Sequence, residues 1–204
     1  MRKFMLIAGL ALELNAMAAP ITFDADAVSQ PPVGWTCGAT GKGVPKWTVE
    51  PDALSGKGRV LVQSGEAPFP WCVKNDAVLS DGFVEVKFRS MAGRQDQAGG
   101  VVWRFKDRDN YYVARANALE NNVSLYHTTA GSRRTIVYQN APVPPKVWHT
   151  LRVDFKGPSI RVSLDGKAYI ERQDTNIVGP GQVGVWTKAD SVTAFTEFSY
   201  GAAP

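Results

Sequence analysis

The chemistry that this sequence offers most clearly rests on basic, amide and aromatic side chains that alternate along strand-like stretches. Successive side chains of a strand point to opposite faces, so six of these basic, amide and aromatic side chains fall on one face of the expected sheet. An aromatic ring gives sugar C–H groups a flat apolar surface, while asparagine and arginine donate directional hydrogen bonds to hydroxyls and carboxylates. Three cations on this face favour a uronate, a sulfate or another anionic ligand. The sequence therefore predicts a carbohydrate-binding patch of Arg104, Tyr111, Arg115, Asn117, Trp186 and Lys188.

Other roles stay open for the same residues. Arg104 and Arg115 could instead pair with Glu120 or Asp190 and hold loops in place, with Trp186 filling the space beneath them. The two carboxyls could also form a catalytic pair, because glycoside cleavage needs two carboxyls about 5–5.5 Å apart for retention or about 6.5–9.5 Å apart for inversion. Solvated turn carboxylates are far commoner, so we favour binding without catalysis over hydrolysis or elimination. A structural, envelope-associated domain is the third alternative.

Metal and general-base chemistry have weaker signals. Carboxylates that could bind calcium occur in pairs near two turns, at Asp24, Asp26, Asp107 and Asp109. The same spacing is typical of turns that the carboxylates cap, so calcium stays an alternative and no metal ligand or other cofactor is assigned. His127 and His149 are each isolated, and we expect both to be structural.

The elements that position the patch form a predicted three-stranded meander. Its strands are Val101–Lys106, Tyr111–Asn117 and Val123–His127, and the first turn is 107–110, rich in Asp and Asn. This turn places Arg104 opposite Val113 and sets a packed face against the polar one. The packed face carries Val101, Trp103, Phe105, Tyr112, Ala114 and Ala116.

Strand and turn signals continue along most of the chain. We expect twelve to fourteen short strands and no helix, with residues 29–43 as a loop and residues 68–71 as an irregular link. Asp165-Gly166 is the strongest hairpin signal. Strands alone at this length predict an all-β, two-sheet antiparallel jelly-roll sandwich.

The first 18 residues have the pattern of a secretory signal: a basic start, an apolar segment and Ala16-Met17-Ala18 before the cleavage point. The expected mature chain, residues 19–204, is one domain. Without Arg2, Lys3 and Glu13 it has 21 basic and 18 acidic residues, a net charge of +3. This charge is far from that of a nucleic-acid binder. We predict a periplasmic or secreted monomer without a membrane span.

The two cysteines, Cys37 and Cys72, suit a disulfide in an oxidising compartment, with two buried thiols as the alternative. The bridge would close a loop of about 35 residues and stabilise the fold by about 3–4 kcal/mol.

Several segments resemble an exported bacterial family of concanavalin A-like, laminin-G-like domains. They are the runs 96–104 and 109–122, Trp148–Val153, Leu164–Lys167 and Gly184–Val192. The resemblance implies a jelly-roll fold but no particular activity, because relatives of the fold bind sugars, cleave them or do neither. Our first hypothesis is that a glycan binds on the concave sheet. The chain is also distantly similar to 3-keto-disaccharide hydrolase domains. The Glu-x-Asp-x-x-Glu strand of family-16 glycoside hydrolases has no counterpart here, since Glu85 stands alone on its strand.

Overall fold

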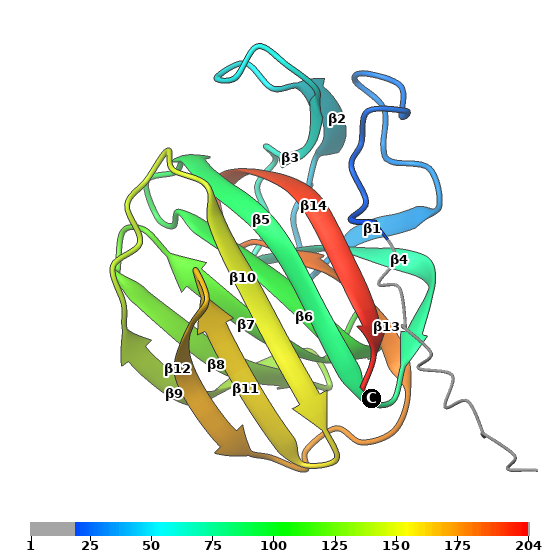
Figure 1. Cartoon of the computed structure of the whole chain (residues 1–204), viewed down its shortest axis with the longest axis vertical. Coiled ribbons are helices and arrows are strands. Elements are labelled where there is room, and N and C mark those ends of the chain that lie inside the picture. The colour runs from blue at the N-terminus through cyan, green and yellow to red at the C-terminus, as the bar shows by residue number, and fades with distance from the viewer. Residues whose placement is uncertain (1–18, 204) are drawn as a thin grey trace, which may run out of the picture.

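Two antiparallel sheets of seven strands each make up the fold, in a computed structural model that describes residues 19–203. The predicted signal, residues 1–18, lies outside the described residues. Figure 1 shows the two layers face to face, with β10, β5 and β14 in front of β7, β6 and β13. The all-β sandwich and the number of strands confirm the prediction. No helix long enough and apolar enough to cross a membrane occurs in the described part of the chain.

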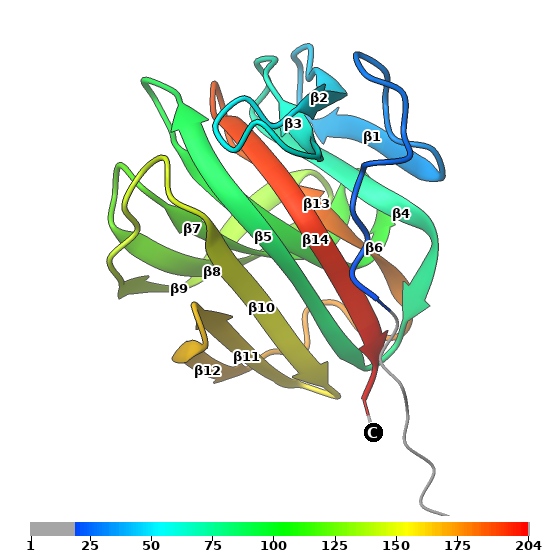
Figure 2. The same cartoon turned by 45° about the horizontal axis from the view of Figure 1, so that its top comes forward.

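The first sheet carries most of the predicted patch. Its strands, in spatial order, are β1 (Trp35–Thr40), β4 (Phe69–Leu79), β13 (Gly181–Trp186), β6 (Ala98–Asp107), β7 (Asn110–Asn117), β8 (Asn122–Thr129) and β9 (Ser132–Asn140). The second sheet has the order β12 (Lys167–Gln173), β11 (Ser159–Leu164), β10 (His149–Lys156), β5 (Gly82–Ala92), β14 (Val192–Ala202), β3 (Arg59–Gln63) and β2 (Trp47–Pro51). Figure 2 shows β1, β2 and β3 gathered at one end of the sandwich.

The main core lies between the sheets and follows the period-two pattern of the strands. On β5, Val84, Val86 and Phe88 are fully buried, while the residues between them are partly exposed. They pack in one cluster with residues such as Trp103 and Tyr112 of the facing sheet. Alternation of this kind is what allows a sequence to specify an antiparallel sandwich.

Two segments expected to be irregular are strands that pair with each other. The predicted loop contains β1, and the predicted aromatic link begins β4. Cys37 and Cys72 are directly opposite in this pair and form the predicted disulfide. Packing explains the glycine at position 38, because a Cβ there would lie only 2.8 Å from the Trp71 ring. Glycine therefore marks close approach of a large ring in this strand, where we had expected a loop.

The register of the central meander differs from the expected one. Val113 lies opposite Val102, where Arg104 was expected, and the β6–β7 ladder is interrupted by a bulge after Trp103. Arg104 has a φ of 47°, in the left-handed region that suits a bulge. The bulge changes which face the following residues occupy. Phe105, expected in the main core, consequently packs on the opposite side of the sheet.

Candidate functional site

The outer face of the first sheet, which points away from the second sheet, carries a second hydrophobic cluster. It comprises Trp71, Val73, Val102, Phe105, Tyr111, Val113, Tyr126 and Trp186, with Phe69 packed against it. Strand β7 is therefore buried on both faces. A sheet face that binds a ligand along its whole length would be open to solvent, so the cluster limits where a ligand can reach.

Curvature of the first sheet closes the outer face near the start of β7. Tyr111 and Thr40, from strands separated by three others, lie with their hydroxyls 2.8 Å apart. Thr40 also donates to the carbonyl of Arg108 in the β6–β7 turn. Burial raises the pKa of Tyr111. Tyr111 is thus a packed residue of the curled sheet.

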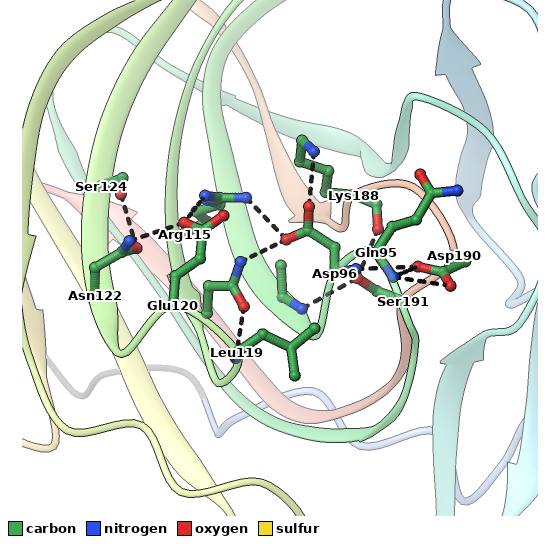
Figure 3. Close-up of polar contacts among 12 residues, drawn as sticks. Gln95, Asp96, Arg115, Leu119, Glu120, Asn122, Ser124, Lys188, Asp190 and Ser191 are labelled. Atoms are coloured by element: carbon green, nitrogen blue, oxygen red, sulfur yellow. Dashed lines mark hydrogen bonds and ion pairs between the residues drawn. The ribbon is translucent and has the colours of Figure 1, made fainter.

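A buried polar network lies on the same face, centred on the carboxylate of Asp96 (Figure 3). Asp96 is 1% exposed and accepts hydrogen bonds from Arg115 Nη1 at 3.0 Å, Asn117 Nδ2 at 2.5 Å and Lys188 Nζ at 2.7 Å. Arg115 and Asn117 are themselves buried, whereas the Lys188 side chain is 26% exposed. Three donors, two of them cationic, therefore surround the Asp96 carboxylate.

The network continues from Arg115 toward the β7–β8 turn. Arg115 Nη2 lies 2.5 Å from the carboxylate of Glu120, and Asn122 donates to the same oxygen at 2.8 Å. Arg115 therefore has two carboxylate partners. One of them is Glu120, as expected from the alternative in which Arg115 holds a loop in place. An arginine occupied in this way has limited capacity for a ligand.

Asp190 serves a different loop. Its carboxylate accepts the backbone N–H groups of Arg94, Gln95 and Asp96 at 2.7–3.2 Å. Burial raises the pKa of Asp190, but these backbone hydrogen bonds outweigh it and lower the pKa below its ordinary value. A carboxyl held ionised in this way is poorly suited to be a general acid. Glu120 pairs with Arg115, whereas Asp190 caps the loop 94–96, so each carboxyl has a separate structural role.

Arg104 does not join the patch, and its expected position was wrong. The bulge turns its side chain between the sheets, 5.8 Å from the centre of the Phe155 ring. It donates to the carbonyls of Gly157 at 2.7 Å and Ile177 at 3.0 Å and contacts Asp81 at 3.3 Å. Arg104 thus holds three loops together at one end of the sandwich.

The remaining five predicted patch residues share the outer face, but they differ in accessibility. Tyr111, Arg115, Asn117 and Trp186 are each at most 1% exposed. Lys188 alone among them lines a groove, whose volume is about 700 Å³. The groove lies where the ends of β1 and β4 approach the loop after β13. Its other lining residues include Lys42, Glu66, Phe69, Gln95 and Arg133.

Phe69 and Arg133 give the groove its chemical character, and neither was in the predicted patch. Phe69 is half-buried and lies in an offset stack with Trp186, with ring centres 6.0 Å apart. The Arg133 guanidinium lies 4.7 Å from the centre of the Phe69 ring and 4.2 Å from that of Tyr126. Arg133 belongs to β9, whose burial pattern does not alternate regularly and whose pairing with β8 is interrupted by a bulge, so the sequence offered no local signal for this position.

Arg133 has no ion pair with any residue of the described chain, and its Nη1 is buried without a hydrogen-bond partner. Burial lowers the pKa of Arg133, and the nearby Arg115 lowers it further. A partly buried cation with an unmet hydrogen-bond donor is stabilised by any anion that can reach it.

Three of the four carboxylates considered for calcium cap backbone groups, and the fourth, Asp109, lies 3.8 Å from Arg108. Asp24 accepts the N–H of Arg59 at 2.7 Å, and Asp107 accepts the N–H of Asp109 at 2.8 Å. Asp26 likewise accepts the N–H of Val33 at 2.9 Å. Within residues 19–203, no three His, Cys, Asp or Glu side chains form a group that could hold a metal ion.

The two histidines have local hydrogen-bond partners. Nδ1 of His149 lies 2.7 Å from the Asp165 carboxylate, and its Nε2 lies 3.0 Å from the carbonyl of Pro144. His127 Nδ1 lies 3.0 Å from the hydroxyl of Thr129. These contacts fit the structural roles predicted for both residues.

A second groove, of about 720 Å³, lies on the second sheet. Two aromatic residues line it, Phe155 and Phe83, and Arg152 covers Phe83 at 4.0 Å from the ring centre. Arg152 is itself paired with Asp154 at 2.6 Å and with Glu85 at 3.5 Å. The charge of this arginine is already compensated, unlike that of Arg133.

Comparison with solved structures places the architecture among known sandwiches. A carbohydrate-binding module, CBM66 from Bacillus subtilis, matches with a TM-score of 0.67 and 22% identity, over 83% of this chain and 96% of that one. The carbohydrate recognition domain of Emp46p matches with a TM-score of 0.63 and 12% identity, over 91% and 97%. A β-glucanase of Bacillus licheniformis matches with 0.59 and 13%, over 92% and 99%.

The fold is the concanavalin A-like jelly roll. This confirms the fold that the resemblance implied, and at these identities the likeness shows the fold alone. No family model matches the chain. No curated protein matches it in sequence.

Proposed function

We propose that this protein is a periplasmic or secreted carbohydrate-binding domain that binds an anionic glycan in the groove beside Phe69. The observation that carries the proposal is the combination of a half-buried aromatic ring with an arginine that lacks a carboxylate partner, in one groove. Such a groove offers a surface for a sugar ring and a donor for a sugar carboxylate or sulfate.

The charge around the groove supports an anionic ligand. Lys42, Arg133 and Lys188 line it together with one acid, Glu66. Lys188 is neutralised by Asp96, so Arg133 and Lys42 supply the uncompensated charge. The jelly-roll fold is consistent with this role, since solved structures that share it include a carbohydrate-binding module and a carbohydrate recognition domain.

Affinity electrophoresis of the chain from Ala19 tests the proposal. Gels would contain sodium polygalacturonate or dextran sulfate, with dextran as a neutral gel. We expect slower migration in an acidic gel, lost in Phe69→Ala but kept in Phe83→Ala, the matched change in the groove of the second sheet. Circular dichroism would confirm that both variants are folded. Unchanged migration in every gel, or equal loss in both variants, would contradict the proposal. Release of reducing ends during incubation with the same polysaccharides would instead support an enzyme.

A further inference from the structure

We propose that Arg133 is a charge-dependent cover of the groove, which yields to an anionic glycan and excludes a neutral one. The inference rests on the proposed function and adds how the same site chooses its ligand class. Arg133 lies on the edge strand of the first sheet and covers the ring of Phe69, which lies near the opposite edge.

The position of Arg133 makes it a cover. It belongs to β9, whereas Phe69 belongs to β4, and four strands lie between them in the sheet. The guanidinium reaches across because the sheet is curled, and it lies 4.7 Å from the Phe69 ring centre and 5.8 Å from that of Trp186. A sugar cannot stack on the ring face that Arg133 occupies until the guanidinium moves.

The cover is held in place by weak interactions. Its contacts are with the rings of Phe69, Tyr126 and Trp186, and no carboxylate of the described chain pairs with it. Cation–π contacts are modest compared with an ion pair in a partly buried site. Burial is the main cause of the lowered pKa of Arg133, and the neighbouring guanidinium of Arg115 adds repulsion to it. Arg133 can therefore leave the rings when a stronger partner arrives.

Only an anionic ligand supplies that partner. A sugar carboxylate or sulfate can accept parallel hydrogen bonds from the guanidinium, satisfy the unpaired Nη1 and release the Phe69 ring for stacking. A neutral sugar would have to displace the cation from the rings without compensating its charge. The groove therefore selects its ligand in two ways: it attracts an anionic glycan, and it imposes on a neutral glycan the free-energy cost of displacing Arg133 from the rings.

Matched ligands and matched variants test this cover. The ligands are polygalacturonate with its carboxyl-reduced form, and dextran sulfate with dextran, so each acidic polymer has a neutral partner of the same backbone. The variants are Arg133→Ala, Arg133→Lys and Arg134→Ala. Arg134 is the exposed neighbour on the same strand, and its removal changes the net charge by the same amount.

We expect Arg133→Ala to bind the acidic polymer about tenfold to a hundredfold more weakly, the range of a charge-assisted hydrogen bond. The same variant should gain retardation by the neutral partner, because the Phe69 ring is uncovered. Arg133→Lys should keep part of the acidic affinity, and Arg134→Ala should behave as the unmodified chain. Which acidic polymer responds separates a carboxylate from a sulfate as the recognised group.

Three results would overturn the cover but not the proposed function. Equal losses of affinity for the acidic polymer in Arg133→Ala and Arg134→Ala would show that only the net charge of the protein matters. Loss of acidic binding without any gain for the neutral partner would show that Arg133 does not block the ring. Binding of neutral polymers by the unmodified chain would overturn the cover while leaving glycan binding in place. Failure of the unmodified chain to bind any of the four polymers would overturn the proposed function as well.

Discussion

Replacing Asp96 with asparagine should lower the free energy of unfolding by about 3 kcal/mol. The carboxylate is 1% exposed and compensates Arg115, whose side chain is 2% exposed, at 3.0 Å. Removing one partner of a buried ion pair costs about 3–5 kcal/mol, because the other charge stays buried. Glu120 keeps contact with Arg115, and the new amide can still accept a hydrogen bond, so we expect the lower end of this range. The loss is large against the roughly 5–15 kcal/mol of a typical domain.

Urea unfolding of the disulfide-bonded chain, followed by tryptophan fluorescence with linear extrapolation, measures this loss. The control is Asp76→Asn. The Asp76 side chain is 72% exposed and pairs with Lys74 at the surface, so its replacement should leave stability unchanged. A loss below about 1 kcal/mol for Asp96→Asn would refute the reasoning, because the Arg115 charge would then be compensated by Glu120 or solvent alone.

Two further changes test other parts of the fold. Burial raises the pKa of Asp52, but hydrogen bonds from Arg89 and from the following turn outweigh it and lower the pKa from 3.8 to about 2. The resulting stability is complete above about pH 4 and is lost as the pH falls through 2. The advantage of the native chain over Asp52→Asn should therefore shrink by about 2 kcal/mol between pH 5 and pH 1.5 in acid-dependent urea unfolding; a constant difference would contradict this. Replacing both Cys37 and Cys72 with alanine should lower the unfolding free energy by about 3–4 kcal/mol, since the bridge closes a separation of 35 residues. Reductant should have no effect on the stability of this variant. A urea unfolding midpoint equal to that of the native chain would argue against the bridge.

Much of the fold was present in the local pattern of the sequence. The burial of β5 follows the alternation of its residues, and the Asp-rich turn 107–110 separates β6 from β7 as predicted. The two cysteines were paired correctly. These features depend on the two-residue period of a strand and on side chains that cap their own turns, so neighbouring residues suffice to predict them.

The positions of the patch residues were predictable only in part. Arg115, Asn117 and Lys188 share a face, as alternation indicated, but their common partner Asp96 lies in the loop before β6. Arg104 was misplaced because one bulge changes the face of every later residue on the strand. The bulge depends on how β6 packs against the loops that Arg104 contacts. Those loops are distant in the sequence, so the alternating pattern of the strand does not reveal the bulge.

By itself, the sequence determined that this chain forms an antiparallel β-sandwich with a disulfide and a basic, aromatic sheet face. Only the tertiary structure decided which of those residues a ligand can reach. Curling of the first sheet buries Tyr111 and Trp186 and brings Arg133 over Phe69, although 64 residues separate the two in the chain. Sheet curvature and the register of distant strands arise from contacts between segments far apart in sequence, so no local pattern contains them.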